Sequence, residues 1–244
     1  MAEARESKKR KRAKAPASES ASHSESAARF LTEHGISISM RQQEPPRPCV
    51  TLEDAPFPPS VVALLHAKGI TAPSAVQGAT WPYAVEGHDV LAIAQTGSGK
   101  TLAFLLPALS VAVRYERSTD SPRCLVVVPT RELAIQVHTE ALKFGATLGC
   151  RTLAVYGGAS KHEQAQKLKL GTDVLVATPG RLMDHLGTHH SHQAQDGLSA
   201  LRLSYCLMLV LDEAEYPGRI RDPRSQEQIR GKSALPAEGS EQTT

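Results

Sequence analysis

The chain has 244 residues, of which 41% are hydrophobic and 4% aromatic, so it can form one large domain with a mainly aliphatic core. Its net charge of +3 is too small to indicate a nucleic-acid partner by itself. The four cysteines lie far apart and form no Cys-x-x-Cys pair, which argues against disulfides and against a zinc site. No apolar run approaches the roughly 20 residues of a membrane span, so we expect no membrane partner.

The N-terminal part of the chain is polar and basic. Residues 1–28 contain seven Lys or Arg and no Leu, Ile, Val or Phe, so residues 1–40 are predicted to be a disordered basic and serine-rich tail. Five consecutive basic residues at 8–12 favour a nuclear-localisation signal or a phosphate-binding arm over a merely solvated tail. Residues 41–59 contain six prolines and are interpreted as a linker.

A regular alternation of elements occupies residues 60–215. Short apolar runs alternate with segments of helical period, which predicts an α/β fold with a parallel sheet covered by helices on both faces. Residues 216–244 contain few large apolar residues and are predicted to be a disordered tail. The expected strands are Val90–Ala94, Cys124–Val128, Thr152–Tyr156, Val174–Ala177 and Cys206–Leu211, and the expected helices are Ser60–Lys68, Ala75–Val85, Lys100–Val113, Glu132–Gly145, Lys161–Leu170 and Arg181–Leu186.

A glycine-rich loop stands between the first expected strand and a helix. Its backbone N–H groups and the positive end of the helix can bind phosphate oxygens. Lys100 would reach the β- and γ-phosphates of a nucleotide, and the Thr101 hydroxyl would bind Mg²⁺. An ordinary glycine turn before a helix is the alternative, although the Gly-Lys-Thr frame speaks against it. The expected nucleotide-binding residues of this loop are Ala94, Gln95, Thr96, Gly97, Ser98, Gly99, Lys100 and Thr101, with Ala94 at a position where the general pattern has Gly.

Two carboxylates, Asp212 and Glu213, follow the apolar residues 207–211. A phosphate loop needs a second site of this kind to hold the metal and to orient water. Asp212 would hold Mg²⁺, and Glu213 would orient or deprotonate the attacking water. Together with Lys100 they are the expected catalytic residues. The alternative is a pair of acidic residues that only ends a strand.

Together these motifs resemble those of the DEAD-box RNA helicases of superfamily 2, over the residues from about Val50 to Ala214. The segment Gly69–Gln77 is similar to the family's Q motif, in which Gln77 would read the edge of adenine. The family's own form of the phosphate loop accepts Ala at the position of Ala94. The resemblance implies a RecA-like P-loop NTPase lobe that uses ATP and Mg²⁺ and acts on RNA.

Three further segments resemble the RNA-contacting motifs of the family's first lobe, and each lies where an expected strand ends and a helix begins. Ligands of open parallel sheets bind outside the carboxyl ends of the strands, where helix N-termini and glycine backbone can bind phosphates. We therefore expect contacts with the RNA backbone and little sequence preference. Taken alone, residues 178–181 could be a plain helix start with proline at its first position. The expected RNA-binding residues are Pro129, Thr130, Arg131, Glu132, Gly157, Gly158, Thr178, Pro179, Gly180 and Arg181.

The chain also departs from the family pattern. Leu52 stands 17 positions before Gly69, where the family has a Phe that stacks on adenine, so ATP affinity is expected to be weaker. Glu215 replaces the last Asp of the namesake motif. After Ala214 the resemblance is expected to end, which implies that the strand ending in Ser-Ala-Thr and the whole second lobe are absent. The chain is therefore predicted to be a truncated, incomplete and unstable first lobe that cannot unwind RNA alone.

Three functions are open at this point: an ATP-dependent RNA helicase, a non-enzymatic module that binds ATP or RNA, and another P-loop ATPase such as a DNA translocase. The Q motif and the segment Pro129–Leu133 speak against the translocase. ATP turnover with and without RNA separates the other two. The basic residues 8–12 favour a location in the nucleus or nucleolus and an association with ribonucleoprotein or pre-ribosomes.

Overall fold

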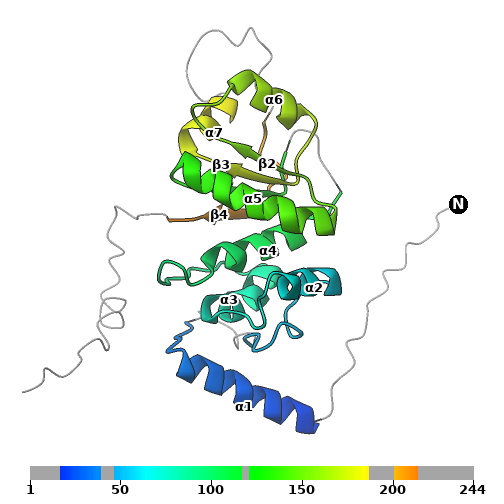
Figure 1. Ribbon diagram of the computed structural model, residues 1–244, viewed down its shortest axis with the longest axis vertical. Coiled ribbons are helices and arrows are strands. Elements are labelled where there is room, and N and C mark those ends of the chain that lie inside the picture. Colours follow the sequence, from blue (N-terminus) through cyan, green and yellow to red (C-terminus); the bar gives the residue numbers. More distant parts are fainter. Residues whose placement is uncertain (1–16, 40–46, 117–120, 187–200, 214–244) are drawn as a thin grey trace, which may run out of the picture. The chain divides into compact units, whose positions relative to one another are not determined.

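The computed structural model describes residues 17–39, 47–116, 121–186 and 201–213. In these parts of the chain, four short strands form a parallel sheet in the order β2-β3-β1-β4 (Figure 1). The strands are β1 (Cys124–Val127), β2 (Thr152–Val155), β3 (Val174–Ala177) and β4 (Met208–Leu211). Each lies within a run that the sequence predicts to be a strand, and the parallel pairing is confirmed.

Helices follow three of these strands, as a parallel sheet requires. After β1, β2 and β3 come α5 (Arg131–Leu148), α6 (Lys161–Lys169) and α7 (Pro179–Leu186). The elements before β1 are α2 (Pro59–Ala67), α3 (Ala75–Glu86) and α4 (Lys100–Ala112). All six agree with the predicted helices to within a few residues. Among the described helices, none is both long and apolar enough to cross a membrane.

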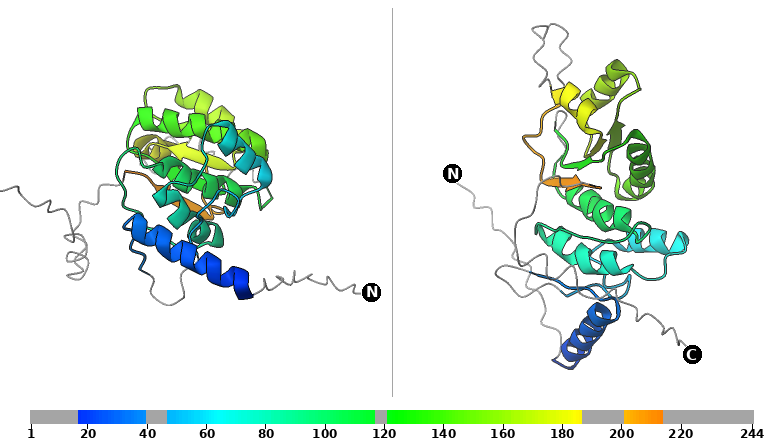
Figure 2. Two further views of the ribbon diagram at one scale, coloured as in Figure 1. Left: turned by 60° about the horizontal axis from the view of Figure 1, so that its bottom comes forward. Right: turned by 90° about the vertical axis from the view of Figure 1, so that its left-hand side faces the viewer.

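Apolar cores lie on both faces of the sheet, because successive side chains of a strand point to opposite faces. From β1, Val126 joins the larger core, to which α2, α3, α4 and α5 contribute. The neighbouring Leu125 joins a second core with Leu168 of α6 and Leu182 of α7. Figure 2 shows helices on either side of the sheet. The predicted covering of both faces is therefore confirmed.

The expected strand Val90–Ala94 does not form. The segment has no regular secondary structure, and Leu91 and Ile93 are 80% and 83% exposed. A strand is stabilised by its ladder of hydrogen bonds to a neighbour, and among the described residues no strand pairs with this segment. The apolar pattern predicts a strand correctly only where the sheet offers a partner, so the prediction was wrong here.

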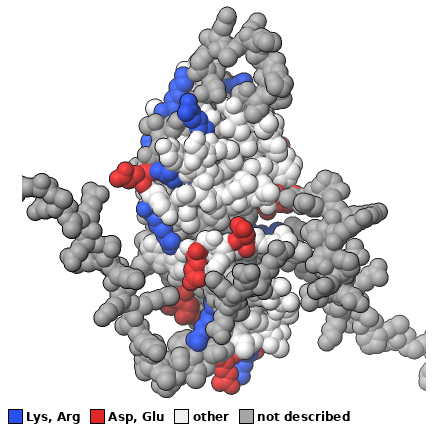
Figure 3. Space-filling model, turned by 180° about the vertical axis from the view of Figure 1, so that it is seen from behind, with Lys and Arg blue, Asp and Glu red and all other residues white. Residues whose placement is uncertain are grey.

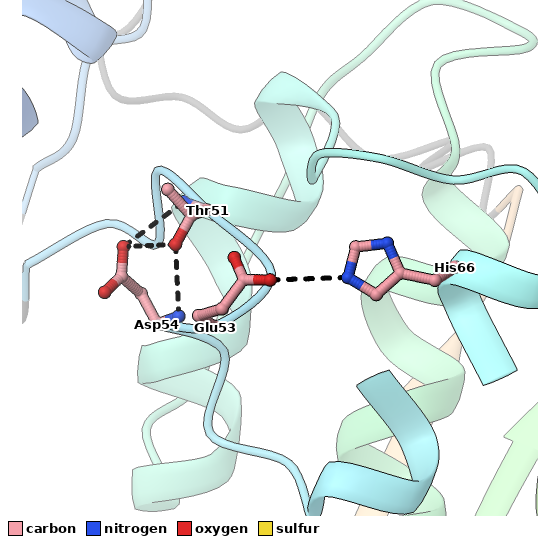
Figure 4. A network of polar contacts seen from close by, with 4 residues as sticks. All are labelled: Thr51, Glu53, Asp54 and His66. Atoms are coloured by element: carbon pink, nitrogen blue, oxygen red, sulfur yellow. Dashed lines mark hydrogen bonds and ion pairs between the residues drawn. The ribbon is translucent and has the colours of Figure 1, made fainter. Parts of the chain in front are cut away.

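The predicted linker 41–59 is wrong for its described part, residues 47–59, which pack into the domain. Leu52 is fully buried in the larger core, and Phe57 is buried edge-on against Trp81, with ring centroids 5.0 Å apart. Thr51 and Asp54 exchange short-range hydrogen bonds, and Glu53 Oε1 lies 3.3 Å from His66 Nε2 of α2 (Figure 4). Prolines disfavour regular helices and strands before α2 begins at Pro59, but they do not prevent side chains from being buried.

Helix α1 (Ala17–Glu33) lies within residues 1–40, so the predicted disordered tail is wrong for this part of the chain. Ala27 and Phe30 are buried. A Cβ atom at Gly78 of α3 would lie 2.9 Å from the Phe30 ring, so the ring packs directly on the α3 backbone. The tail prediction rested on the absence of large apolar residues up to residue 28. It missed that Ala27 and Phe30, three positions apart, share one helix face.

Two predictions concern residues outside the described ranges, namely the basic run at residues 8–12 and the tail at residues 216–244. The chain divides into the units Met1–Asp212 and Glu213–Thr244. Of the second unit, the structure describes Glu213, whose φ is 50°.

Candidate nucleotide and RNA site

The phosphate loop turns through two glycines into the first residue of α4. Gly97 and Gly99 have φ of 81° and 91°, a left-handed conformation that costs glycine little. The Ser98 N–H donates to the Gln95 carbonyl over 3.3 Å, which closes the turn. The Lys100 Nζ donates to the Ala94 carbonyl over 2.7 Å and to the Gln95 carbonyl over 3.3 Å. Two carbonyl groups at the start of the loop therefore hold the Lys100 ammonium near the positive end of α4.

The Q-motif glutamine is attached to this loop. Gln77 is buried in the first turn of α3, where its Oε1 accepts from the Ser74 N–H over 3.0 Å. Its Nε2 donates to the Gly99 carbonyl over 3.0 Å. A primary amide carries two N–H groups and two acceptor lone pairs, so one of each remains for a further partner. The adenine contact expected of Gln77 stays a prediction, and the structure adds a link from α3 to the phosphate loop.

Because of this link, Gly99 has no room for a side chain, whereas Gly97 has. A Cβ atom at Gly99 would lie 2.5 Å from Gln77 Nε2 and 3.0 Å from Ser74 Oγ, whereas a Cβ at Gly97 would meet nothing within 4 Å. Both residues have positive φ, so alanine strains the backbone at either position. Gly99→Ala should therefore weaken ATP binding about tenfold more than Gly97→Ala, measured by titration with a fluorescent ATP analogue. Equal losses for the two variants would show that the Gln77 contact is unimportant.

The adenine side of the site has no aromatic ring at the position of Leu52. Leu52 and Phe57 are both buried, and Phe57 packs on Trp81. The fixed turn at Thr51–Asp54 keeps Leu52 in the core. Neither side chain is exposed to a ligand, and the loss of a stacking contact with adenine stays a prediction.

The proposed metal ligands lie on neighbouring elements of the first unit. Thr101 is the second residue of α4, and Asp212 directly follows β4, where its N–H donates to the Val127 carbonyl over 3.0 Å. Helix α4 packs against β4, and Figure 1 shows the start of α4 and the carboxyl end of β4 on the same side of the sheet. A hydroxyl and a carboxylate are oxygen ligands of the kind that Mg²⁺ prefers, so the donor set fits this ion.

The three expected RNA motifs meet at the carboxyl ends of neighbouring strands. Thr130 caps α5, and its Oγ1 accepts from the Leu133 N–H over 3.2 Å. The Arg131 guanidinium lies 5.3 Å from the centroid of the Tyr156 ring. A Cβ at Gly158 would lie 2.8 Å from Arg131 Nη1, so this guanidinium also covers Gly158. The motifs after β1 and β2 therefore form one continuous surface, on which Pro129, Glu132 and Gly157 are also exposed.

Arg181 has a different environment from the one expected of an RNA ligand. Its side chain is 11% exposed, and its Nη1 donates to the Ala159 carbonyl over 2.9 Å and to Gln164 Oε1 over 3.0 Å. Its Nε lies 3.4 Å from a carboxylate oxygen of Asp184. Arg181 thus joins the motif after β3 to the loop after β2, while Pro179 and Gly180 are the exposed members of that motif and Thr178 is half-buried.

Two residues of this region, Ser74 and Gln164, were not predicted from the sequence. Ser74 and Gln77 have the spacing of a capping box, which could have indicated that Gln77 folds back on its own helix start. Gln164 follows no pattern of this kind, because its partners lie 8 and 17 residues away. Only the folded chain shows this residue between the two loops.

The chain is similar to known helicases over most of its described length. The profile of the DEAD/DEAH box helicase family matches residues 74–236, past the Ala214 at which the sequence predicts that the resemblance ends. DEAD-box ATP-dependent RNA helicase 30 of Arabidopsis thaliana is 40% identical over 205 residues, which are 83% of this chain and 32% of the relative. ATP-dependent RNA helicase DBP2 of Ajellomyces capsulatus is 42% identical over 205 residues, 82% of this chain and 35% of the relative.

Solved structures give the same result for the fold. The RNA helicase Prp28 of Chaetomium thermophilum bound to ADP has 34% sequence identity and a TM-score of 0.64 over 75% of this chain and 43% of that chain. This likeness confirms the predicted RecA-like helicase lobe. The chain spans about a third of the length of the curated relatives that it matches. With its family profile and these relatives, the chain belongs to the DEAD/DEAH box helicase family.

Proposed function

We propose that the chain binds ATP with Mg²⁺ at the phosphate loop and the RNA backbone at the carboxyl ends of β1, β2 and β3. In a protein of the relatives' length, these sites would couple ATP hydrolysis to the unwinding of RNA duplexes. The observation that carries the proposal is the joint position of the motifs, since the three RNA motifs and Asp212 all follow strands of one parallel sheet. Ligands of such sheets bind at this edge.

The residues of the loop would contact different parts of ATP. The backbone N–H groups of Thr96–Lys100 and the start of α4 would bind phosphate oxygens, with the Lys100 ammonium on the β- and γ-phosphates. Gln77 would hold the loop through the Gly99 carbonyl and would use its remaining N–H and lone pair on adenine. Thr101 and Asp212 would hold Mg²⁺. When bound, this ion would neutralise negative charge on the phosphates. Glu213 would orient or deprotonate the attacking water.

For RNA, the described geometry favours contacts with the backbone. Helix starts and glycine N–H groups at the ends of the strands recognise phosphates, and Arg131 adds a positive charge beside Gly158. No base edge is read by such groups, so RNA sequences of equal length should bind with similar affinity. Fluorescence anisotropy with labelled single-stranded RNAs of different sequence tests this. Affinities that fall as salt rises support the proposal, whereas strong preference for one sequence, or no RNA binding, would contradict it.

A second candidate function is a non-enzymatic module that binds ATP or RNA. The chain spans about a third of its curated relatives, which favours binding without efficient turnover for these 244 residues. Nucleotide binding supports both functions equally. The comparison of ATP turnover with and without RNA separates them.

We also propose a nuclear location and an association with ribonucleoprotein. The support is the basic run at residues 8–12 and a structural relative, at 28% identity, that is named a yeast DEAD-box splicing factor. A fluorescent fusion of the chain should accumulate in the nucleus, and replacing the five basic residues by alanine should disperse it. Unchanged nuclear accumulation after this replacement would contradict the role of the basic run.

A further inference from the structure

The side chain of Gln164 connects two loops that carry RNA motifs. Gln164 belongs to α6 and is 6% exposed. Its Nε2 donates to the carbonyl of Tyr156 over 3.1 Å, and Tyr156 lies directly after β2 and before Gly157 and Gly158. Its Oε1 accepts from Arg181 Nη1 over 3.0 Å, in the motif that follows β3. One amide thus spans from the glycine pair to the first turn of α7.

The orientation of this amide follows from its partners. A guanidinium only donates, so the atom that faces Arg181 must be the oxygen, and the nitrogen then faces the Tyr156 carbonyl, which only accepts. His185 is fully buried, and its Nε2 lies 3.4 Å from the same oxygen. Burial, and then the nearby Arg181 charge, lower the pKa of His185, which favours a neutral ring that can donate from Nε2. Glutamine fits these partners, while a carboxylate could not donate to Tyr156.

The third motif is joined to the same network through Tyr156. The Arg131 guanidinium lies over the Tyr156 ring, with 5.3 Å to the centroid, while Gln164 holds the carbonyl of that residue. Arg181 Nη1 also donates to the Ala159 carbonyl, just after the glycine pair. Displacement of Gln164 would therefore change the spacing of all three motifs, although the side chain itself lies beneath the surface.

We propose that Gln164 is a positioning residue for RNA binding: its amide fixes the relative placement of the motifs after β1, β2 and β3 without contacting RNA. This inference rests on the proposed function of those motifs. Loss of the Gln164 amide should affect RNA binding and not ATP binding, because Gln164 forms hydrogen bonds with neither the phosphate loop nor Gln77.

The experiment compares Gln164→Met with Gln166→Met in the full 244-residue chain. Methionine has a similar length and removes the amide. Gln166 is a matched control, because it is exposed on the same helix and its amide contacts the His162 side chain. RNA affinity is measured by anisotropy with a labelled single-stranded RNA, ATP-analogue affinity by fluorescence titration, and the melting temperature by differential scanning fluorimetry. We expect Gln164→Met to weaken RNA binding about tenfold, with ATP-analogue affinity unchanged and Gln166→Met like the parent.

A second variant, Gln164→Glu, keeps an acceptor for Arg181 and His185 and removes the donor to Tyr156. It should weaken RNA binding less than Gln164→Met, and it provides the measurement if the methionine variant does not fold. Parent-like RNA affinity of whichever variants fold would overturn the inference. Equal losses of RNA and ATP-analogue affinity together with a lower melting temperature would also overturn it, because they indicate general destabilisation. Absence of RNA binding by the parent chain would instead overturn the proposed function on which the inference rests.

Discussion

RNA should accelerate ATP hydrolysis by the 244-residue chain very little. Its residues up to Asp212 and Glu213 include the expected ATP and metal ligands, and the chain spans about a third of its curated relatives. The resemblance to the family implies that the arginines that close on ATP lie in a second lobe. Because an arginine finger contributes about 10³–10⁵ in turnover, we expect a rate lower by at least about 10³ than that of a full-length relative.

A phosphate-release assay with and without single-stranded RNA measures this effect. A full-length relative provides the positive control, and the variant Glu213→Gln shows how much phosphate release comes from other sources. Strong stimulation by RNA that disappears in Glu213→Gln would contradict the prediction and would exclude the non-enzymatic alternative.

The second large effect concerns stability and self-association. Strand β4 is an edge strand of the sheet. One of its edges pairs with β1, and among the described residues no strand pairs with the other edge of β4. Leu207, Leu209 and Leu211 are exposed there, without a charged residue between them. Figure 3 shows the molecule from behind, where Lys and Arg lie along the left side of the upper part and residues of other types cover the broad area beside them. An uncharged strand edge without a partner strand can pair with another chain. We therefore expect the chain alone to self-associate and to melt below about 45 °C.

One matched pair of variants tests the origin of this behaviour. Leu209, in the middle of β4, is 58% exposed, and Leu170, after α6, is 71% exposed. Leu209→Lys should reduce self-association, whereas Leu170→Lys should leave it unchanged, because a charge prevents pairing between chains only at a strand edge. Light scattering after size-exclusion chromatography measures the self-association. A monomeric parent chain with a cooperative melt above about 45 °C would contradict the account.

The parts of the fold that the sequence predicts well are those with a local cause. The apolar runs of β1, β2, β3 and β4 and the helix starts after the first three depend on nearby residues, and they form as expected. The phosphate loop is also local, since glycines and the following helix define it. The order of the motifs along the chain therefore suffices to predict the edge of the sheet at which the candidate site lies.

Long-range contacts explain where sequence reasoning fails. Residues 90–94 have the composition of a strand, but a strand depends on a neighbour that lies elsewhere in the chain. Leu52 and Phe57 lie among prolines that suggest a linker, yet the core of the domain buries them. Arg181 matches an RNA motif, and only its contacts with Ala159 and Gln164 show that it joins two loops.

The most direct test of the account is the binding of ATP and Mg²⁺ at the phosphate loop, measured by calorimetric titration of the 244-residue chain. Lys100 begins α4 at the loop, and Lys169 is an exposed lysine at the end of α6 that serves as the control. We predict that the parent chain and Lys169→Ala bind ATP alike and that Lys100→Ala binds at least about tenfold more weakly. Equal binding by Lys100→Ala, or no binding by the parent chain, would contradict it.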